Sequence, residues 1–259
     1  MIDIHTHLLP GVDDGSPSID VSLPVLQRFA AGGVDVVVCT PHLMASKAVS
    51  APYNQHAQIL ASLREAAPAG LELKLGWEIM LDTPGTDLRH PQLSLGGSKA
   101  VLVEFPRMSI PPNATDELFR LRTSGILPVL AHPERYVGCT VEQVGEWRQS
   151  GATIQLDGAA LLGHHRMSEL ARAILARGYA DIIASDTHGD SRSLIAVRDW
   201  LVEVGTAEQI DLLTNENARR LLADEPLRAV PPLVVRQGML DRLRRLVLGR
   251  ARSAGSTRQ

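Results

Sequence analysis

The chain has 259 residues and a formal net charge of −3 at pH 7, with 44% hydrophobic and 21% charged residues. This balance is that of an ordinary globular protein, and the slight negative charge argues against a nucleic-acid-binding protein, which is usually basic. Only two cysteines occur, Cys39 and Cys139, too few for a disulfide framework, so a reducing compartment is expected. No apolar run approaches the length of a membrane span and the N-terminus lacks a secretory signal pattern, so we expect a cytoplasmic protein.

Short apolar runs rich in valine, isoleucine and leucine alternate along the chain with segments of helical spacing. We expect strands at residues 2–4, 34–39, 71–75, 100–103, 127–131, 153–156 and 181–184. We expect helices at residues 19–31, 55–66, 114–123, 141–150, 166–177 and 193–204. Such alternation, with strands apolar on both faces, indicates a parallel sheet covered on both sides. Seven units, with no glycine-rich phosphate loop after the first strand, favour an α/β barrel over an open dinucleotide-binding sheet.

Side chains that can bind metal follow six of the seven expected strands. They are His5 and His7 after the first strand, His42 after the second, Glu78 after the third, Glu104 after the fourth, His132 after the fifth, and Asp186 and His188 after the seventh. The C-terminal ends of the strands in a parallel barrel open on one face, and that face carries the active site. His5 and His7 flank Thr6, so both imidazoles point to the same side of the strand. Imidazoles with carboxylates nearby suit a divalent metal ion.

Each of these residues has a simpler interpretation when it is taken alone. A single His-x-His is more often a surface or capping pair than a metal site, and Glu78 or Glu104 alone would be an ordinary strand-end carboxylate. The sequence Asp13-Asp14-Gly15 alone is typical of a turn. The metal-site interpretation therefore rests on the joint placement of these residues at six strand ends. The remaining histidines do not share that placement and are expected at the surface: His56, His90, His164 and His165.

Residues 1–15, MIDIHTHLLPGVDDG, resemble the opening of the PHP (polymerase and histidinol phosphatase) superfamily. More narrowly, they resemble the manganese-dependent tyrosine-protein phosphatases of bacterial capsule and exopolysaccharide loci. Later segments match in unbroken order, namely Thr-Pro-His at 40–42, Gly-x-Glu at 76–78, VEFP at 103–106, AHPERY at 131–136 and SDTH at 185–188. The HPERY segment together with the DDG opening is specific to this branch. The chain departs from the family pattern at Trp77 and at residues 81–84.

The resemblance implies a distorted (β/α)7 barrel of the PHP type with a site for two or three metal ions. One metal would take His5, His7, Glu78 and Asp186, a second would share Glu78 and take Glu104 and His132, and a third would take His42 and His188 with Asp14, or its neighbour Asp13, nearby. Arg135 would bind a phosphate oxygen of the substrate while a metal-activated hydroxide attacks phosphorus. Manganese is the family's expected metal, and iron, zinc or cobalt also suit such ligands.

The activity implied by the resemblance is hydrolysis of phosphotyrosine in proteins. The expected partner is a bacterial membrane tyrosine kinase that regulates capsule or exopolysaccharide synthesis. A histidinol-phosphate phosphatase, or another small-molecule phosphoesterase, shares the ligand pattern and is an alternative, as is a non-catalytic metal-binding module. A cysteine-based tyrosine phosphatase needs an arginine six positions after its cysteine, but Ala45 and Gly145 stand at those positions after Cys39 and Cys139.

The composition changes near the C-terminus, so we expect a catalytic domain over residues 1–232 and a basic segment over residues 233–259. Residues 236–259 contain seven arginines and one acid, Asp241. Leu240, Leu243 and Leu246 recur at helical spacing beside arginines, which predicts a short amphipathic helix. The simple interpretation is a surface helix with a disordered end. The functional hypothesis is docking to an anionic surface, either a membrane leaflet or an acidic, phosphorylated kinase tail.

Overall fold

The computed structural model describes residues 1–235, in which strands and helices alternate as the sequence indicates. The strands are β1 (Ile2–Thr6), β2 (Val36–Cys39), β3 (His42–Met44), β4 (Glu72–Leu75), β5 (Glu78–Met80), β6 (Ala100–Glu104), β7 (Leu127–Ala131), β8 (Thr153–Asp157) and β9 (Ile182–Ala184). The α-helices are α1 (Ile19–Ala31), α2 (Tyr53–Ala66), α3 (Ala114–Thr123), α4 (Val141–Gln149), α5 (Gly158–Leu162), α6 (Arg166–Ala176), α7 (Leu194–Val204), α8 (Ala207–Asp211) and α9 (Asn217–Leu222). Shorter helical segments are η1 (Ala45–Ser50), η2 (Pro91–Leu93), η3 (Pro133–Arg135) and the π-helical η4 (Leu212–Glu216).

All strand pairs are parallel, and they form two hydrogen-bonded sheets, in the order β1-β2-β4 and β3-β5-β6-β7-β8-β9. The expected α/β class is confirmed, but no single closed seven-stranded sheet is present in the described residues. Two of the expected strands are instead each followed by a further short strand, one after Thr40-Pro41 and the other after Gly76-Trp77, and the further strands belong to the second sheet. Proline has no N–H to donate to a neighbouring strand. The lack of a side chain at Gly76 lets Leu95 approach, since a Cβ there would lie 2.6 Å from Leu95 Cδ2.

The first and last strands meet at their C-terminal ends. A parallel bridge pairs Thr6 with Thr187. The backbone N–H of His7 donates to the carbonyl of Thr187 at 2.8 Å, and the N–H of Asp186 donates to the carbonyl of His5 at 3.0 Å. These bonds hold residues from distant parts of the chain side by side, so the side chains that follow β1 and β9 converge.

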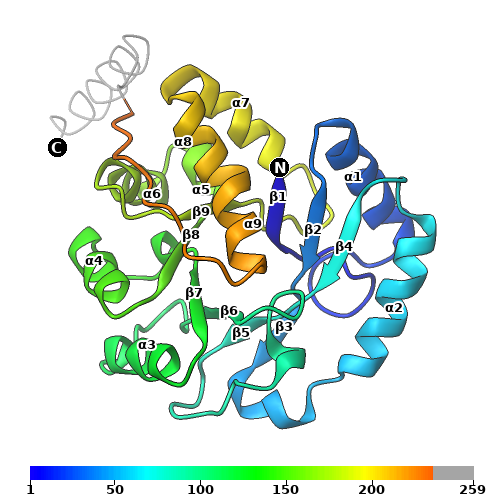
Figure 1. The fold of residues 1–259 in the computed structure, drawn as a ribbon, viewed down its shortest axis with the longest axis horizontal. Helices are drawn as coiled ribbons and strands as arrows, with labels where there is room; N and C mark the ends of the chain where they lie inside the picture. Colours follow the sequence, from blue (N-terminus) through cyan, green and yellow to red (C-terminus); the bar gives the residue numbers. More distant parts are fainter. Residues whose placement is uncertain (236–259) are drawn as a thin grey trace, which may run out of the picture.

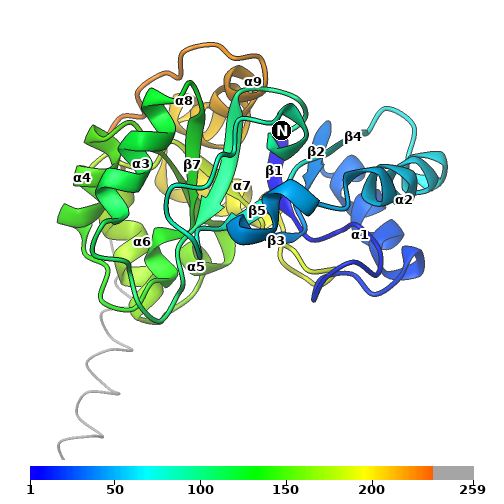
Figure 2. The same ribbon diagram turned by 90° about the horizontal axis from the view of Figure 1, so that it is seen from below.

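The strands lie at the centre of the molecule and the helices surround them (Figure 1). The turned view shows α1 and α2 on one side of the strands and α3, α4 and α6 on the other (Figure 2). Along β6, Val101 and Val103 belong to the hydrophobic cluster that contains Leu118 of α3, whereas Leu102 packs in a different cluster with Val129 of β7. Side chains alternate along a strand. Glu104 therefore points to the same side as Leu102, away from the helix layer.

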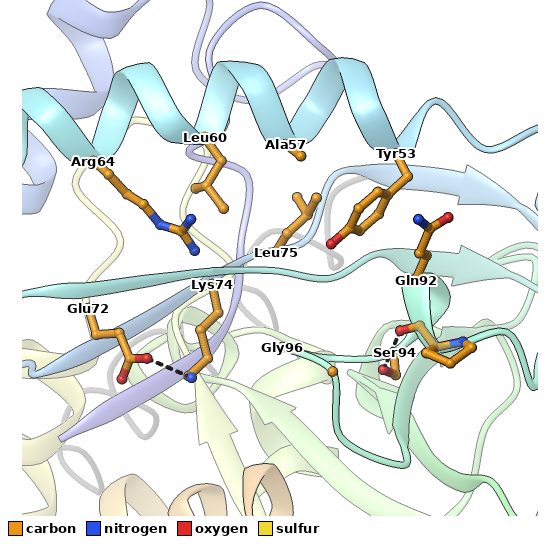
Figure 3. A pocket seen from close by; sticks show the side chains of 12 residues that line it. Tyr53, Ala57, Leu60, Arg64, Glu72, Lys74, Leu75, Gln92, Ser94 and Gly96 are labelled. Carbon is orange, nitrogen blue, oxygen red and sulfur yellow. Dashed lines mark hydrogen bonds and ion pairs between the residues drawn. The ribbon is translucent and has the colours of Figure 1, made fainter.

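The free edge of β4 is covered by α2 and by residues 91–97 (Figure 3). Arg64 of α2 donates from Nε and Nη2 to the carbonyl oxygen of Leu73, at 3.0 and 2.6 Å. The N–H of Gly96 donates to the carbonyl oxygen of Leu75 at 2.8 Å. A cavity of about 330 Å³ lies between these elements. Because these carbonyls are already bonded, the edge is protected from pairing with a strand of another molecule.

No helix within residues 1–235 combines the length and the hydropathy needed to cross a membrane. The basic segment expected over 233–259 lies, from residue 236 onward, outside the described residues, and so does its expected amphipathic helix.

An aromatic cluster supports the loops that follow β6 and β7. Trp147 of α4 is 1% exposed, and its ring centroid lies 5.7 Å from that of Phe105 and 6.3 Å from that of Tyr136. We expect Trp147→Ala to lower the free energy of unfolding by about 3–5 kcal/mol, because it leaves a cavity under both loops. Urea unfolding measures this change. Phe119→Ala on α3, where the side chain is 58% exposed, is the control and should have little effect. A Trp147→Ala protein as stable as the control would contradict this packing.

Candidate metal centre

His5 lies near the end of β1 and His7 directly follows this strand. Both side chains are fully buried, and their Nε2 atoms lie 3.3 Å apart. His5 Nδ1 lies 2.9 Å from Oε1 of Gln155 on β8, and His7 Nδ1 lies 2.7 Å from Oδ2 of Asp13. An oxygen acceptor beside Nδ1 keeps the ring proton on Nδ1, which donates to it, and leaves the Nε2 lone pair free to bind a metal. Both imidazoles are therefore oriented with their Nε2 atoms toward a common point.

Two buried carboxylates face these Nε2 atoms. Glu78 Oε2 lies 3.3 Å from His5 Nε2 and 3.2 Å from His7 Nε2, and Asp186 Oδ1 lies 3.3 Å from both. Asp186 Oδ1 is buried and has no hydrogen-bond partner among the described residues. Burial raises the pKa of Asp186, but the charge on His5 and the close contact with His7 outweigh it, so the pKa lies well below the usual range. Asp186 therefore stays ionised with an oxygen directed at both imidazoles.

Glu78 also connects this pair to His132 and Glu104. His132 Nε2 lies 2.6 Å from Glu78 Oε1 and 3.9 Å from Glu104 Oε2. His132 has φ 33°, in the left-handed region that non-glycine residues rarely adopt, and this conformation turns the chain directly after β7. Burial, followed by the charge of Glu78, raises the pKa of Glu104 to about 7. Two carboxylates held so close together favour a cation beside them.

A third group lies nearer the surface and contains His42, His188 and Asp14. Asp14 Oδ1 lies 3.3 Å from His42 Nε2 and 3.6 Å from His188 Nε2. His42 Nδ1 lies 3.0 Å from Glu78 Oε2, so this group adjoins the buried ones. Asp13, the other candidate from the sequence, binds the ring of His7 and accepts from the backbone N–H of His42 at 3.2 Å. The neighbouring aspartates thus have different positions, with Asp14 at the cluster and Asp13 behind it.

All nine ligands predicted from the sequence come together in four overlapping groups. Within each group the ligand atoms lie within 4.8 Å of one another. The groups are His7, Asp14, His42 and His188; His5, Glu78 and His132; His5, His7 and Asp186; and His42, Glu78 and Glu104. None of the groups found in residues 1–235 includes the four histidines that were expected at the surface. The surface expectation was wrong for His56, which is 7% exposed and stacks on the ring of Trp77. The donor set of imidazoles and carboxylates, with the unpartnered buried oxygen of Asp186, fits divalent metal ions.

Arg135 lies beside this cluster and is 13% exposed. Its Nε and Nη2 donate to Oδ2 of Asp157 at 3.1 and 2.6 Å, and its guanidinium also contacts the carboxylate of Asp186. Asp157 in turn accepts from the N–H of Ala159 at 2.8 Å, which fixes the carboxylate at the start of α5. The guanidinium is thereby held next to the predicted ligands.

The sequence analysis missed several residues that orient this site. Asp157 follows the sixth expected strand, the one to which no polar end was assigned, and that position was a usable signal. Arg192 approaches Asp186 Oδ2 at 3.3 Å from Nη1 and pairs with Asp190 at 2.8 Å from Nε. Arg192 lies on an irregular loop, so no periodicity pointed to it. Gln155 is an isolated polar residue between Ile154 and Leu156 in the expected strand, and that position was its signal in the sequence.

Known proteins are similar to this chain in sequence and in fold. Residues 1–223 match the sequence model of a family described as capsular polysaccharide synthesis, CpsB/CapC. CapC of Staphylococcus aureus is 30% identical over 200 residues, which cover 73% of this chain and 77% of CapC. The tyrosine-protein phosphatase YwqE of Bacillus subtilis is 25% identical over 258 residues, which cover 93% of this chain and 98% of YwqE. A crystal structure from work on YwqE and on CpsB of Streptococcus pneumoniae, described as metal-dependent tyrosine phosphatases, superposes with a TM-score of 0.72 and 27% identity, covering 92% of this chain and 100% of that one.

Gly15 allows the Asp13–Asp14 loop to pack on His7. A Cβ at residue 15 would lie 2.2 Å from the carbonyl oxygen of His7 and 2.4 Å from its Cβ, so the loop must move if a side chain is added. We expect Gly15→Ala to weaken the affinity for divalent metal by about tenfold or more, because both aspartates shift. Calorimetric titration with Mn²⁺ measures this. Ser18→Ala, in the same segment, serves as the control because the Ser18 side chain makes no capping hydrogen bond. Equal affinity in both variants would contradict the role of this loop.

Proposed function

We propose that this chain, which belongs to the CpsB/CapC family of capsular polysaccharide synthesis, is a metal-dependent phosphatase that hydrolyses phosphotyrosine in proteins. The observation that carries the proposal is the convergence of nine predicted ligands in four overlapping groups, one of which contains the buried, unpartnered oxygen of Asp186. The similarity of the whole fold to the metal-dependent tyrosine phosphatases supports the same activity.

We assign three metal positions to the cluster. The first would be held by His5, His7, Glu78 and Asp186, the second by Glu78, Glu104 and His132, and the third by His42, His188 and Asp14. We propose manganese as the metal, with iron, zinc or cobalt as alternatives that imidazole and carboxylate ligands also accept. Such ions, when bound, would supply hydroxide near neutral pH and neutralise charge on the phosphate oxygens.

The protein's own groups bind and orient the phosphate. Arg135 and Arg192 both lie against the Asp186 carboxylate, so two guanidinium groups border the cluster. Guanidinium groups bind phosphate oxygens in pairs of parallel hydrogen bonds. Burial lowers the pKa of Arg135, but the charges of Asp157 and Asp186 outweigh it and raise the pKa above its usual range, so Arg135 stays charged. The phenolate leaving group has a pKa of about 10, so the demand for a general acid is modest.

We also propose that the two sheets together form the distorted (β/α)7 barrel of the PHP superfamily. β2 with β3, and β4 with β5, would each be one interrupted strand, because β2 pairs with β4 and β3 pairs with β5 in the same order. The Thr6–Thr187 bridge would close the ring between β1 and β9. Residues 1–232 would then be the catalytic domain, with a basic segment after it.

A bacterial membrane tyrosine kinase that regulates capsule or exopolysaccharide synthesis is the substrate that we propose. The basic segment, which lies outside the described residues from 236 onward, would dock to the kinase or to the membrane. A cysteine-based mechanism does not fit, because Cys39 and Cys139 are buried and burial raises the pKa of each thiol to about 12. Two buried, unpaired thiols do fit the reducing conditions of the cytoplasm.

Removal of ligands tests the metal assignment. We expect His7→Ala and Asp186→Ala to lower turnover of a phosphotyrosine peptide by at least about 100-fold, since even residues behind metal ligands contribute 10- to 100-fold. Metal content by elemental analysis should fall in parallel, while circular dichroism shows a folded chain. His164→Ala is the control, because this exposed histidine belongs to no ligand group. Wild-type turnover in either variant at saturating Mn²⁺ would overturn the assignment, and faster hydrolysis of histidinol phosphate than of the peptide would favour the small-molecule alternative.

Unlike the predicted ligands, Arg135 and Asp157 are expected to affect catalysis without affecting metal content. Arg135→Ala should keep its metal content but lose about 100-fold in kcat/KM, because a donor to the transition-state charge is removed. Asp157→Asn should lose less, and the double variant should lose no more than Arg135→Ala alone, because Asp157 acts through Arg135. Steady-state kinetics with metal analysis measure both. Loss of metal from Arg135→Ala would show that the pair is structural, and additive losses in the double variant would show that Asp157 acts independently of Arg135.

A further inference from the structure

Several exposed apolar side chains lie on segments that follow strands bearing the predicted ligands or Asp157. Of the eight large hydrophobic side chains that are exposed in residues 1–235, five lie on segments at or after the C-terminal ends of β3, β6, β7 and β8. These five are Met44, Val49, Met108, Val137 and Met167. Monomeric proteins expose isolated apolar residues everywhere, but a concentration of them beside a site marks a binding surface.

Two methionines continue the strands that carry the ligands. His42 and Met44 lie two residues apart on β3, so both side chains are on the same side of the strand, and Glu78 and Met80 have the same relation on β5. The strand register places Met44 opposite Met80, and Met80 opposite Glu104. The two thioether side chains therefore form a row that begins at the ligands and leads outward.

The neighbouring loops extend this row. The backbone N–H of Val137 donates to the carbonyl oxygen of Arg107 at 2.9 Å, so the loop after β7 is bonded to the loop after β6. Met108 is 80% exposed and Val137 is 54% exposed. Met108 follows Glu104 by four residues and Val137 follows Arg135 by two. Met44, Met80, Met108 and Val137 are called the apolar rim below.

The geometry of a phosphotyrosine substrate indicates which part of it reaches the apolar rim. When a phosphotyrosine phosphate reaches the cluster, its phenyl ring extends outward and its main chain must cross the residues that border the cluster. Side chains next to the phosphotyrosine then lie within about 7 Å of its Cα, the distance of two strand residues. A small phosphomonoester would not reach these residues and would leave the rim in water. Each rim residue lies within four residues of a predicted ligand or of Arg135, on segments that a bound polypeptide would have to cross.

We propose that the apolar rim binds the polypeptide that flanks phosphotyrosine and selects for apolar side chains next to it. This inference rests on the proposed phosphatase function and adds a substrate preference to it. Methionine is flexible and polarizable, so a surface built largely from it accepts apolar side chains of several shapes. The expected specificity is therefore for apolar character beside the phosphotyrosine and not for one sequence.

Two isosteric substitutions test the rim without touching a predicted ligand. Met108→Gln and Val137→Thr keep the size of each side chain and replace apolar atoms with polar ones, and the Val137 backbone bond to Arg107 is retained. The substrates are two phosphotyrosine peptides that differ only in having leucine or serine on either side of the phosphotyrosine, with para-nitrophenyl phosphate as the small reference. We expect the wild-type protein to cleave the leucine peptide with a kcat/KM roughly tenfold above that of the serine peptide. The double variant should reduce this ratio to near one.

The matched control is Val202→Thr on α7, where a valine that is 64% exposed lies outside the rim, and it should keep the wild-type ratio. A wild-type protein without preference for the leucine peptide, or a double variant that keeps the preference, overturns the proposal. So does a double variant that changes the oligomeric state by sedimentation, because the rim would then be an interface with a second copy. A wild-type protein that, with Mn²⁺, cleaves para-nitrophenyl phosphate and neither peptide overturns the proposed protein phosphatase function itself, and this result is distinct from loss of the peptide ratio alone.

Discussion

The site is organised around one buried carboxylate, that of Glu78, which is 1% exposed and lies within 3.3 Å of a nitrogen on each of four imidazoles: His5, His7, His42 and His132. Burial raises the pKa of Glu78, but the charge of His5 and the hydrogen bonds from the imidazoles lower it further, so the net shift is downward. The interruption of β4 and β5 at Gly76-Trp77 sets the position of this carboxylate. Trp77 is buried, donates to the carbonyl oxygen of Gln92 at 2.9 Å and stacks on His56, so the backbone before Glu78 is fixed from outside the cluster.

The helices and the clustering of the candidate ligands could be predicted because both depend on patterns that can be read directly from the amino-acid sequence. The six expected helices appear within two residues of their expected bounds, since each is long enough to show helical periodicity. The clustering of the candidate ligands could be predicted because parallel strands bring their C-terminal ends to one face, so the histidines and acids that follow the strands lie close together. Helices α5, α8 and α9 have five or six residues each, less than two turns, and show no usable period.

Other parts of the site depend on contacts that no local pattern encodes. The division of the strands follows from Thr40-Pro41 and from the close approach of Leu95 to Gly76, which is a tertiary contact. In the unusual segment 81–84, Asp82 accepts from the N–H of Ser46 at 2.9 Å, which joins the chain after β5 to η1. Arg192 reaches Asp186 only because the loop after β9 folds back. The choice between Asp13 and Asp14 required the position of both side chains.

The scarcity of aromatic residues has a practical consequence for spectroscopy. The chain has three tryptophans, three tyrosines and three phenylalanines, and several of them adjoin the cluster. Trp77 immediately precedes Glu78, while Phe105 and Tyr136 directly follow Glu104 and Arg135 and pack with Trp147. Two of the three tryptophans therefore lie beside the segments that carry the predicted ligands, and the third, Trp200, lies on α7 with Arg172 over its ring. Tryptophan emission of the unlabelled protein thus reports on this region together with a contribution from α7.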